Sequence, residues 1–244
     1  LAALHDDLDA PLLAVTPRAD DAKRLYEQLH IWTAQPATLV LYPDPDTLPY
    51  ERTPAGDLSA RHRMGVLARI GGLDENGADS APLLVVASAR AAAHKTLPMR
   101  DLAANSRVLR RGQRAPLQEL LTQWLRLGYE PVTLVEEPGQ LSHRGGIVDI
   151  FPVTSAQPVR LEFFGDVIDS LRSFDAATQR STGMVASVLV TPPADVLPER
   201  APQVAAALDA LDKTRLAPEV AEQWRAEAER LRLGVAGAQG REVW

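Results

Sequence analysis

Three short and almost uninterrupted apolar runs set the strongest limit on what this chain folds into. They are PLLAV (11–15), TLVLY (38–42) and PLLVVAS (82–88). Strands without polar positions on either face are typical of a parallel sheet that helices cover on both sides. Apolar residues at helical spacing over 19–31 and 58–70 supply such helices between the runs. This alternation of strand and helix predicts an α/β fold with a parallel sheet for residues 1–105.

The pattern changes after residue 105, where shorter strand patterns replace the apolar runs. A helix pattern over 115–127 ends at Gly128, and Gly165-Asp166 separates two strand patterns as a hairpin turn does. We therefore expect a small inserted α+β domain over 106–184. Its strands are expected at 107–110, 132–135, 147–151, 159–164 and 167–174.

The remaining segment, 185–244, is expected to be mainly helical. A strand pattern, SVLVTP, leads into the proline-rich connector PPADVLPERAP. Amphipathic helix patterns then cover 203–211 and 218–233. The sequence thus predicts three parts, each with its own kind of secondary structure.

Composition narrows the class of protein. Hydrophobic residues make up 45% and charged residues 24% of the 244, as in ordinary globular proteins. The absence of cysteine excludes disulfides and thiolate metal sites and favours a cytoplasmic location. The acidic start, LAALHDDLDA, excludes a signal peptide, and no apolar stretch is long enough to span a membrane. Because the sequence begins at Leu1 rather than at methionine, we expect a fragment of a longer protein, although processing would give the same start.

Motifs that carry chemistry are missing from the sequence. A phosphate-binding loop needs Gly-x-x-x-x-Gly-Lys-Ser/Thr, whereas Lys95-Thr96 follows Ala-Ala-Ala-His with no glycine nearby. The histidines show neither an i, i+4 pair nor a zinc-binding arrangement. No catalytic, cofactor-binding or metal-binding residue can be assigned, so we expect a chain that is not an enzyme.

Three stretches resemble one family, the bacterial transcription-repair coupling factors, whose N-terminal module is related to UvrB. They are YPDPDTLPYERTPAGDLSARHRMGVLARI (42–70), EPGQLSHRGGIVDIFP (137–152) and VRLEFFGDVIDSLRSFDAATQRS (159–181). The combination of RGGIVDIFP with RLEFFGD is specific to the family, and the resemblance covers most of residues 11–195. It is weak beyond Pro198.

The resemblance implies an identity for each part. Residues 1–105 would be a degenerate RecA-like sheet, like UvrB domain 1a without its phosphate loop. Residues 106–184 would be the UvrA-binding domain 2, and 185–244 a segment like domain 1b. Only a dozen residues separate Asp46 from Ser59, too few for the aromatic hairpin that UvrB inserts into damaged DNA. ATP-driven translocation on DNA and RNA polymerase binding would belong to C-terminal domains outside this sequence.

The family's UvrA-contacting residues carry over onto Arg144, Arg160 and Phe164. Because side chains alternate along a strand, Arg160 and Phe164 are expected on one face and Leu161 on the other. An exposed aromatic residue beside arginines is typical of interface hot spots. In the alternative interpretation, Phe164 tucks under the hairpin and both arginines are merely solvated.

Two glycines following Arg144, Gly145 and Gly146, are expected to form a turn that a partner's backbone can approach closely. The function implied is recruitment of UvrA, and with it nucleotide excision repair, to stalled RNA polymerase.

A second basic cluster lies near the start of the insert and consists of Arg107, Arg110, Arg111 and Arg114. It would contact DNA or an acidic partner, or form a solvated edge strand. The alternative function, a DNA-binding or damage-sensing module, depends on this cluster. The net charge of −6 opposes that alternative, because binding to phosphates requires an excess of basic residues.

Overall fold

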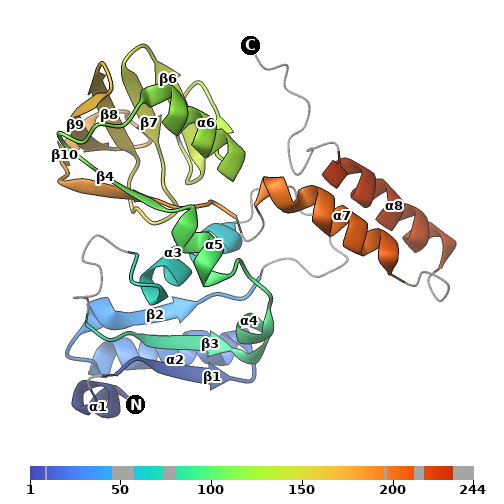
Figure 1. The fold of residues 1–244 in the computed structure, drawn as a ribbon. Helices are drawn as coiled ribbons and strands as arrows, with labels where there is room; N and C mark the ends of the chain where they lie inside the picture. Colours follow the sequence, from blue (N-terminus) through green and yellow to red (C-terminus); the bar gives the residue numbers. More distant parts are fainter. Residues whose placement is uncertain (9, 46–57, 74–80, 195–196, 212–216, 233–244) are drawn as a thin grey trace.

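The structure is a computed structural model that describes all residues except 9, 46–57, 74–80, 195–196, 212–216 and 233–244. It is a mixed α/β fold with one parallel sheet and two further sheets. The parallel sheet and the largest sheet lie at opposite ends of the molecule, with helices between and beside them (Figure 1). The short connection expected between Asp46 and Ser59 falls largely outside the described residues.

The parallel sheet contains the three apolar runs, as predicted. Its strands are β1 (Leu12–Thr16), β2 (Leu39–Tyr42) and β3 (Leu84–Ser88), in the order β1-β3-β2. Every residue of the central strand β3 is buried. Leu13 and Val15 on the edge strand β1 are exposed, so the covering of the sheet is incomplete there.

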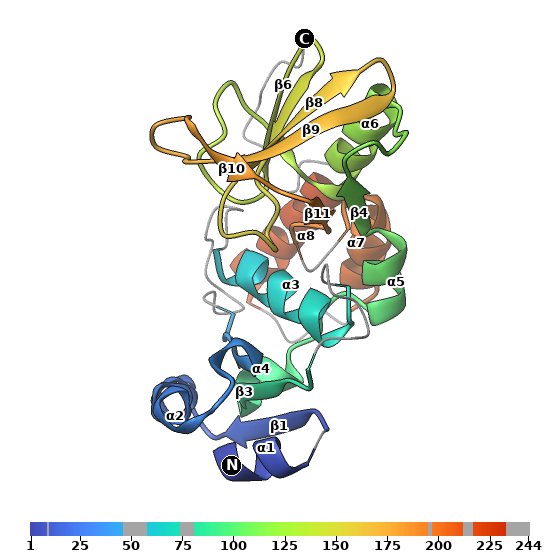
Figure 2. The same ribbon diagram turned by 90° about the vertical axis from the view of Figure 1, so that its left-hand side faces the viewer.

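Helices cover the two faces of this sheet. They are α2 (Ala19–Trp32) on one face, and α3 (Leu58–Ile70) and α4 (Ala89–Ala93) on the other. The helix α3 has the bounds that its pattern predicts, and it lies between the two large sheets in both views (Figure 2). Two further short helices, α1 (Ala2–Asp7) and α5 (Met99–Ala104), were not predicted.

The largest sheet has six strands in the order β10-β9-β8-β7-β6-β5. They are β5 (Glu130–Pro131), β6 (Gln140–Arg144), β7 (Ile147–Ile150), β8 (Val159–Phe164), β9 (Val167–Phe174) and β10 (Ser181–Met184). Neighbouring strands are antiparallel except β5 and β6, which are parallel. The helix α6 (Leu117–Leu127) packs on one face, where Trp124 and Leu161 belong to the same buried core.

The sequence-based assignment of a strand to 132–135 is wrong. The strand β5 ends at Pro131, and Val135 is buried in a loop cluster with Phe151 and Phe174. The apolar character of this stretch therefore reflects a small core under a loop.

Two strands join the six-stranded sheet to the rest of the chain. They are β4 (Arg107–Arg110) and β11 (Ser187–Val190), which pair with each other antiparallel. The chain consequently enters and leaves the six-stranded region side by side. After the short turn η3 (Pro198–Arg200), the helices α7 (Ala201–Ala210) and α8 (Pro218–Arg232) pack against each other, as the predicted helical segment requires (Figure 1).

Candidate functional site

The face of the six-stranded sheet opposite α6, called the outer face below, carries polar and charged side chains. Paired residues of antiparallel strands lie on the same face, so the strand register identifies its members. They form two rows, Ser142–Asp149–Arg160–Arg172 and Arg144–Ile147–Glu162–Ser170. The sheet thus brings Arg144 and Arg160 to one surface, as the sequence predicts.

Arg160 is fixed on the outer face by its neighbours. Its Nε and Nη2 donate to the two carboxylate oxygens of Asp149 at 2.7 and 2.8 Å. The guanidinium also lies 5.0 Å from the centroid of the Phe174 ring. The hydrogen bond to Asp149 raises the pKa of Arg160, which therefore stays charged. Sequence reasoning missed Asp149 as its partner.

Phe164 is the most exposed large hydrophobic side chain of the described residues, with 84% of its surface accessible. It ends β8 at the hairpin and pairs with Val167, which is also exposed. Leu161 is fully buried, and Phe163 packs against the core. The expected assignment of faces is therefore confirmed, and the alternative with Phe164 tucked under the hairpin is wrong.

Arg144 lies exposed at the end of β6, where its Nη2 donates to the carbonyl oxygen of Thr133 at 2.7 Å. Gly145, in the following turn, has φ +61° and open space around it. A Cβ on Gly146 would lie 3.0 Å from the carbonyl oxygen of Phe163. A side chain at Gly146 would thus press on the backbone of β8, whereas Gly145 leaves the surface beside Arg144 open.

The second basic cluster does not form a single patch. Arg107 is half-buried in β4, whereas Arg110, Arg111 and Arg114 are exposed at its end and in the following turn. Arg111 donates from Nε to the carbonyl oxygen of Asp169 at 2.9 Å. It lines, together with Phe164, a surface hollow of about 500 Å³. The structure therefore brings part of this cluster to the Phe164 hairpin, although the two segments lie far apart in sequence.

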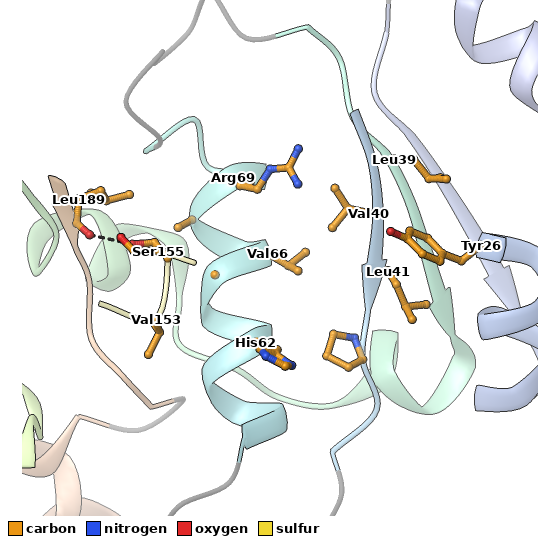
Figure 3. Close-up of a pocket in the computed structure, with 14 residues that line it drawn as sticks. Tyr26, Leu39, Val40, Leu41, His62, Val66, Arg69, Val153, Ser155 and Leu189 are labelled. Carbon is orange, nitrogen blue, oxygen red and sulfur yellow. Dashed lines mark hydrogen bonds between the residues drawn. The ribbon is translucent and has the colours of Figure 1, made fainter. Parts of the chain in front are cut away.

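A second hollow, of about 590 Å³, lies between β2, α3 and residues 153–155 (Figure 3). Its walls are mainly apolar, with Val40 and Val66 on opposite sides. Arg69 donates to the carbonyl oxygen of Ala37, and Thr154 donates to that of Leu189 at 2.7 Å. The first contact joins α3 to the turn before β2, and the second joins residues 153–155 to β11. Neither brings a nucleophile together with a base.

Among the described residues, no three histidine, aspartate or glutamate side chains lie close enough together to hold a metal ion. Within the same residues, no helix is long and apolar enough to cross a membrane.

The family model described as the UvrB interaction domain matches residues 108–195. This range covers nearly all of β4, the whole six-stranded sheet and β11. The region that carries the outer face is therefore the part of the chain that is similar to the UvrB interaction domain.

Curated relatives extend the similarity to most of the chain. The transcription-repair-coupling factor of Myxococcus xanthus is 35% identical over 205 residues, which are 81% of this chain and 16% of the relative. That of Bacillus subtilis is 30% identical over 196 residues (80% and 16%), and that of Escherichia coli K12 is 31% identical over 182 residues (75% and 15%). The chain belongs to the transcription-repair coupling factor family. It spans about 16% of the length of these relatives.

Proposed function

We propose that this chain is a non-catalytic protein-recognition module that binds UvrA through the outer face of its six-stranded sheet. It would thereby recruit nucleotide excision repair to stalled RNA polymerase. The observation that carries the proposal is Phe164, which is 84% exposed at the hairpin, on the face that also carries Arg144 and Arg160. Aromatic residues and arginines dominate the binding energy of protein interfaces, and a large apolar side chain left in water is stabilised by a partner.

The three residues have different roles in this proposal. Phe164 is the apolar anchor. Arg144 uses Nη2 for the Thr133 carbonyl, and its remaining donors suit a carboxylate of UvrA. Arg160 is oriented in advance by Asp149 and Phe174, so little conformational entropy is lost when a partner docks on it.

We extend the proposal to the other parts of the chain. The parallel sheet of residues 1–105 would be a degenerate RecA-like domain, similar to UvrB domain 1a. Ligands of open α/β sheets bind at the carboxyl ends of the strands. At that edge Ser88 donates to Asp44 and caps α4 by accepting from the Ala91 amide at 2.9 Å. Ser88 and Asp44 therefore use these polar groups in hydrogen bonds within the chain. Together with the missing phosphate loop, this supports the proposal that the chain does not hydrolyse ATP.

The division into parts at 106–184 and 185–244 is likewise proposed, with β4 and β11 as the connection. ATP-driven translocation and RNA polymerase binding would belong to regions of the full-length protein outside this sequence. Cytoplasmic location follows from that role.

The proposal is tested by titrating purified UvrA against the chain and three variants. Phe164→Ala and Arg144→Glu are expected to weaken binding by about 2 kcal/mol or more, because each removes an interface anchor. Arg126→Glu, an exposed residue on α6 at the opposite face, is the matched control and is expected to bind normally.

A DNA mobility shift at physiological salt tests the alternative function in parallel. Unchanged UvrA affinity of Phe164→Ala, or tight DNA binding by a chain that does not bind UvrA, would contradict the proposal.

A further inference from the structure

We infer that the UvrA-binding surface continues beyond Phe164 into the hollow beside the 111–114 turn, which receives an apolar side chain flanked by carboxylates. This inference rests on the proposed function and adds the chemistry of the partner segment. The hollow joins two features that the sequence presents separately, the Phe164 hairpin and the arginines that follow β4.

The walls of the hollow combine apolar and basic groups. It is lined by Arg111, Gly112, Phe164, Val167, Ile168 and Asp169. Phe164 and Val167 are exposed hydrophobic residues. Gly112 has φ +79°, and a Cβ there would meet nothing within 4 Å, so this wall is open. The hollow therefore offers apolar surface to one inserted side chain.

Backbone hydrogen bonds fix the two sides of the hollow relative to each other. The amide of Gly112 donates to the carbonyl oxygen of Ile168 at 2.8 Å, and the amide of Ile168 donates to that of Gln113 at 3.0 Å. The amide of Ala115 donates to the carbonyl oxygen of Asp166 at 2.7 Å. Arg111 and the start of β9 thus belong to one rigid unit, and a partner meets a preformed site.

The charges indicate an acidic protein segment rather than a nucleic acid. Arg111 uses Nε for the Asp169 carbonyl, which leaves its Nη groups available for a bidentate carboxylate. The Arg114 side chain is 79% exposed at the same turn, where it lies 3.6 Å from the Asp166 carboxylate. The hollow, with Arg111 as the only arginine of the described residues that lines it, also differs from the long basic groove that follows a nucleic-acid strand.

The test compares the association kinetics of UvrA with Arg111→Glu, Phe164→Ala, the double variant and the Arg126→Glu control. We expect Arg111→Glu to slow association by roughly tenfold at low salt, with a smaller effect at high salt, because a charge at the rim acts on encounter. Arg126→Glu is expected to leave the rate within about twofold of the unmodified chain, because it lies away from the contact. Phe164→Ala should lose less affinity in the Arg111→Glu background than alone, because both residues contact the same partner segment.

The results distinguish a failure of this inference from a failure of the proposed function. If Phe164→Ala weakens UvrA binding while Arg111→Glu behaves like Arg126→Glu, the hollow is not part of the contact and the inference is wrong. If no variant changes UvrA binding, the proposed function itself fails. If Arg111→Glu abolishes a DNA mobility shift but leaves UvrA association unchanged, the hollow serves a nucleic acid instead. Melting temperatures of all variants exclude loss of folding as the cause.

Discussion

The two large sheets of this molecule use their faces in different ways. In the parallel sheet, consecutive residues of β3 are buried on opposite faces, with Val86 under α2 and Val85 toward α3 and α4. In the antiparallel sheet, consecutive residues of β8 alternate between a buried core at Leu161 and an outer face with Arg160 and Glu162.

The difference explains where an interaction surface can arise. A strand covered on both faces has no side chain to offer a partner without a loss of stability. A strand covered on one face can change its outer residues at little cost to folding. The candidate contact residues accordingly lie on the antiparallel sheet, although the parallel sheet contains the more hydrophobic strands.

Alanine substitutions of buried residues in the two sheets test this comparison. They are expected to have the largest effects on stability. Leu84→Ala and Leu161→Ala are each expected to lower the free energy of unfolding by about 2 to 5 kcal/mol, because each leaves a cavity in a core. Val85→Ala, on the opposite face of β3 from Leu84, should also destabilise the fold. Phe164→Ala should stay within about half a kcal/mol in chemical denaturation. A loss of stability in Phe164→Ala as large as that in Leu161→Ala would show that the faces are assigned incorrectly.

Reversing the charge of Arg160 tests whether residues of the outer face can be substituted without loss of stability. Sequence alone suggests that Arg160→Glu changes binding and leaves stability nearly intact. The structure corrects this expectation, because the new carboxylate would oppose Asp149 on the neighbouring strand. A loss of about 1 to 2 kcal/mol in the free energy of unfolding is expected, since both a charge-assisted hydrogen bond and an ion pair are replaced by repulsion.

The matched variant is the exchange Asp149→Arg with Arg160→Glu. It should recover stability, because the pair is restored, but it should not recover UvrA binding. Recovery of binding as well would mean that Arg160 acts only through Asp149.

Tyr129 tests the contact between the six-stranded region and the segment that follows β11. Its hydroxyl donates to the carbonyl oxygen of Thr191 at 2.9 Å, and burial raises the pKa of Tyr129 above its ordinary range. Tyrosine ionises at a pH of about 10 in the unfolded chain, so this contribution to stability is fully present below that pH and is lost as the pH rises further. Tyr129→Phe should cost about 1 to 2 kcal/mol near neutral pH, because it leaves a buried carbonyl group without its donor.

The measurement is the denaturation midpoint as a function of pH from neutrality to alkaline conditions. The variant should show a weaker loss of stability on the alkaline side than the unmodified chain. Parallel curves would show that Tyr129 does not carry the alkaline transition.

Asp175, in the loop between β9 and β10, should give the smallest effect. Hydrogen bonds from the hydroxyl and amide of Thr178 lower the pKa of the Asp175 carboxyl. Its contribution is present above the ordinary pKa of aspartate and is lost as the pH falls through the lowered value. Asp175→Asn should therefore reduce the acid-induced fall in melting temperature slightly, and an unchanged acid profile would contradict this role.

The sequence predicts the strands that form apolar runs or alternate, and it misses short strands that do neither. The bounds of β8 and β9 follow from alternation around Gly165-Asp166, and those of α3 from helical spacing. The strand β6 reads QLSHR and is identified only by its pairing with β7. Short strands and helices also escape prediction, because too few residues are present to establish a period.

The features of the candidate site could likewise be predicted from the sequence only in part. The exposure of Phe164 could be predicted, because alternation from the buried Leu161 determines its face. The ion pair between Arg160 and Asp149 could not be predicted, because it depends on the register of β7 against β8. The hollow beside Arg111 could not be predicted either, because it depends on backbone hydrogen bonds between segments distant in sequence.

The pairing of β4 with β11 gives the six-stranded region two adjacent ends. Arg107 faces Val190 and Arg110 faces Ser187, so the strands that lead in and out are separated only by the spacing of paired strands, about 5 Å. A recombination event can therefore transplant the region into another host loop without stretching either scaffold, as inserted domains with neighbouring ends permit. Such portability would let the six-stranded region move between host proteins while each host keeps its own architecture.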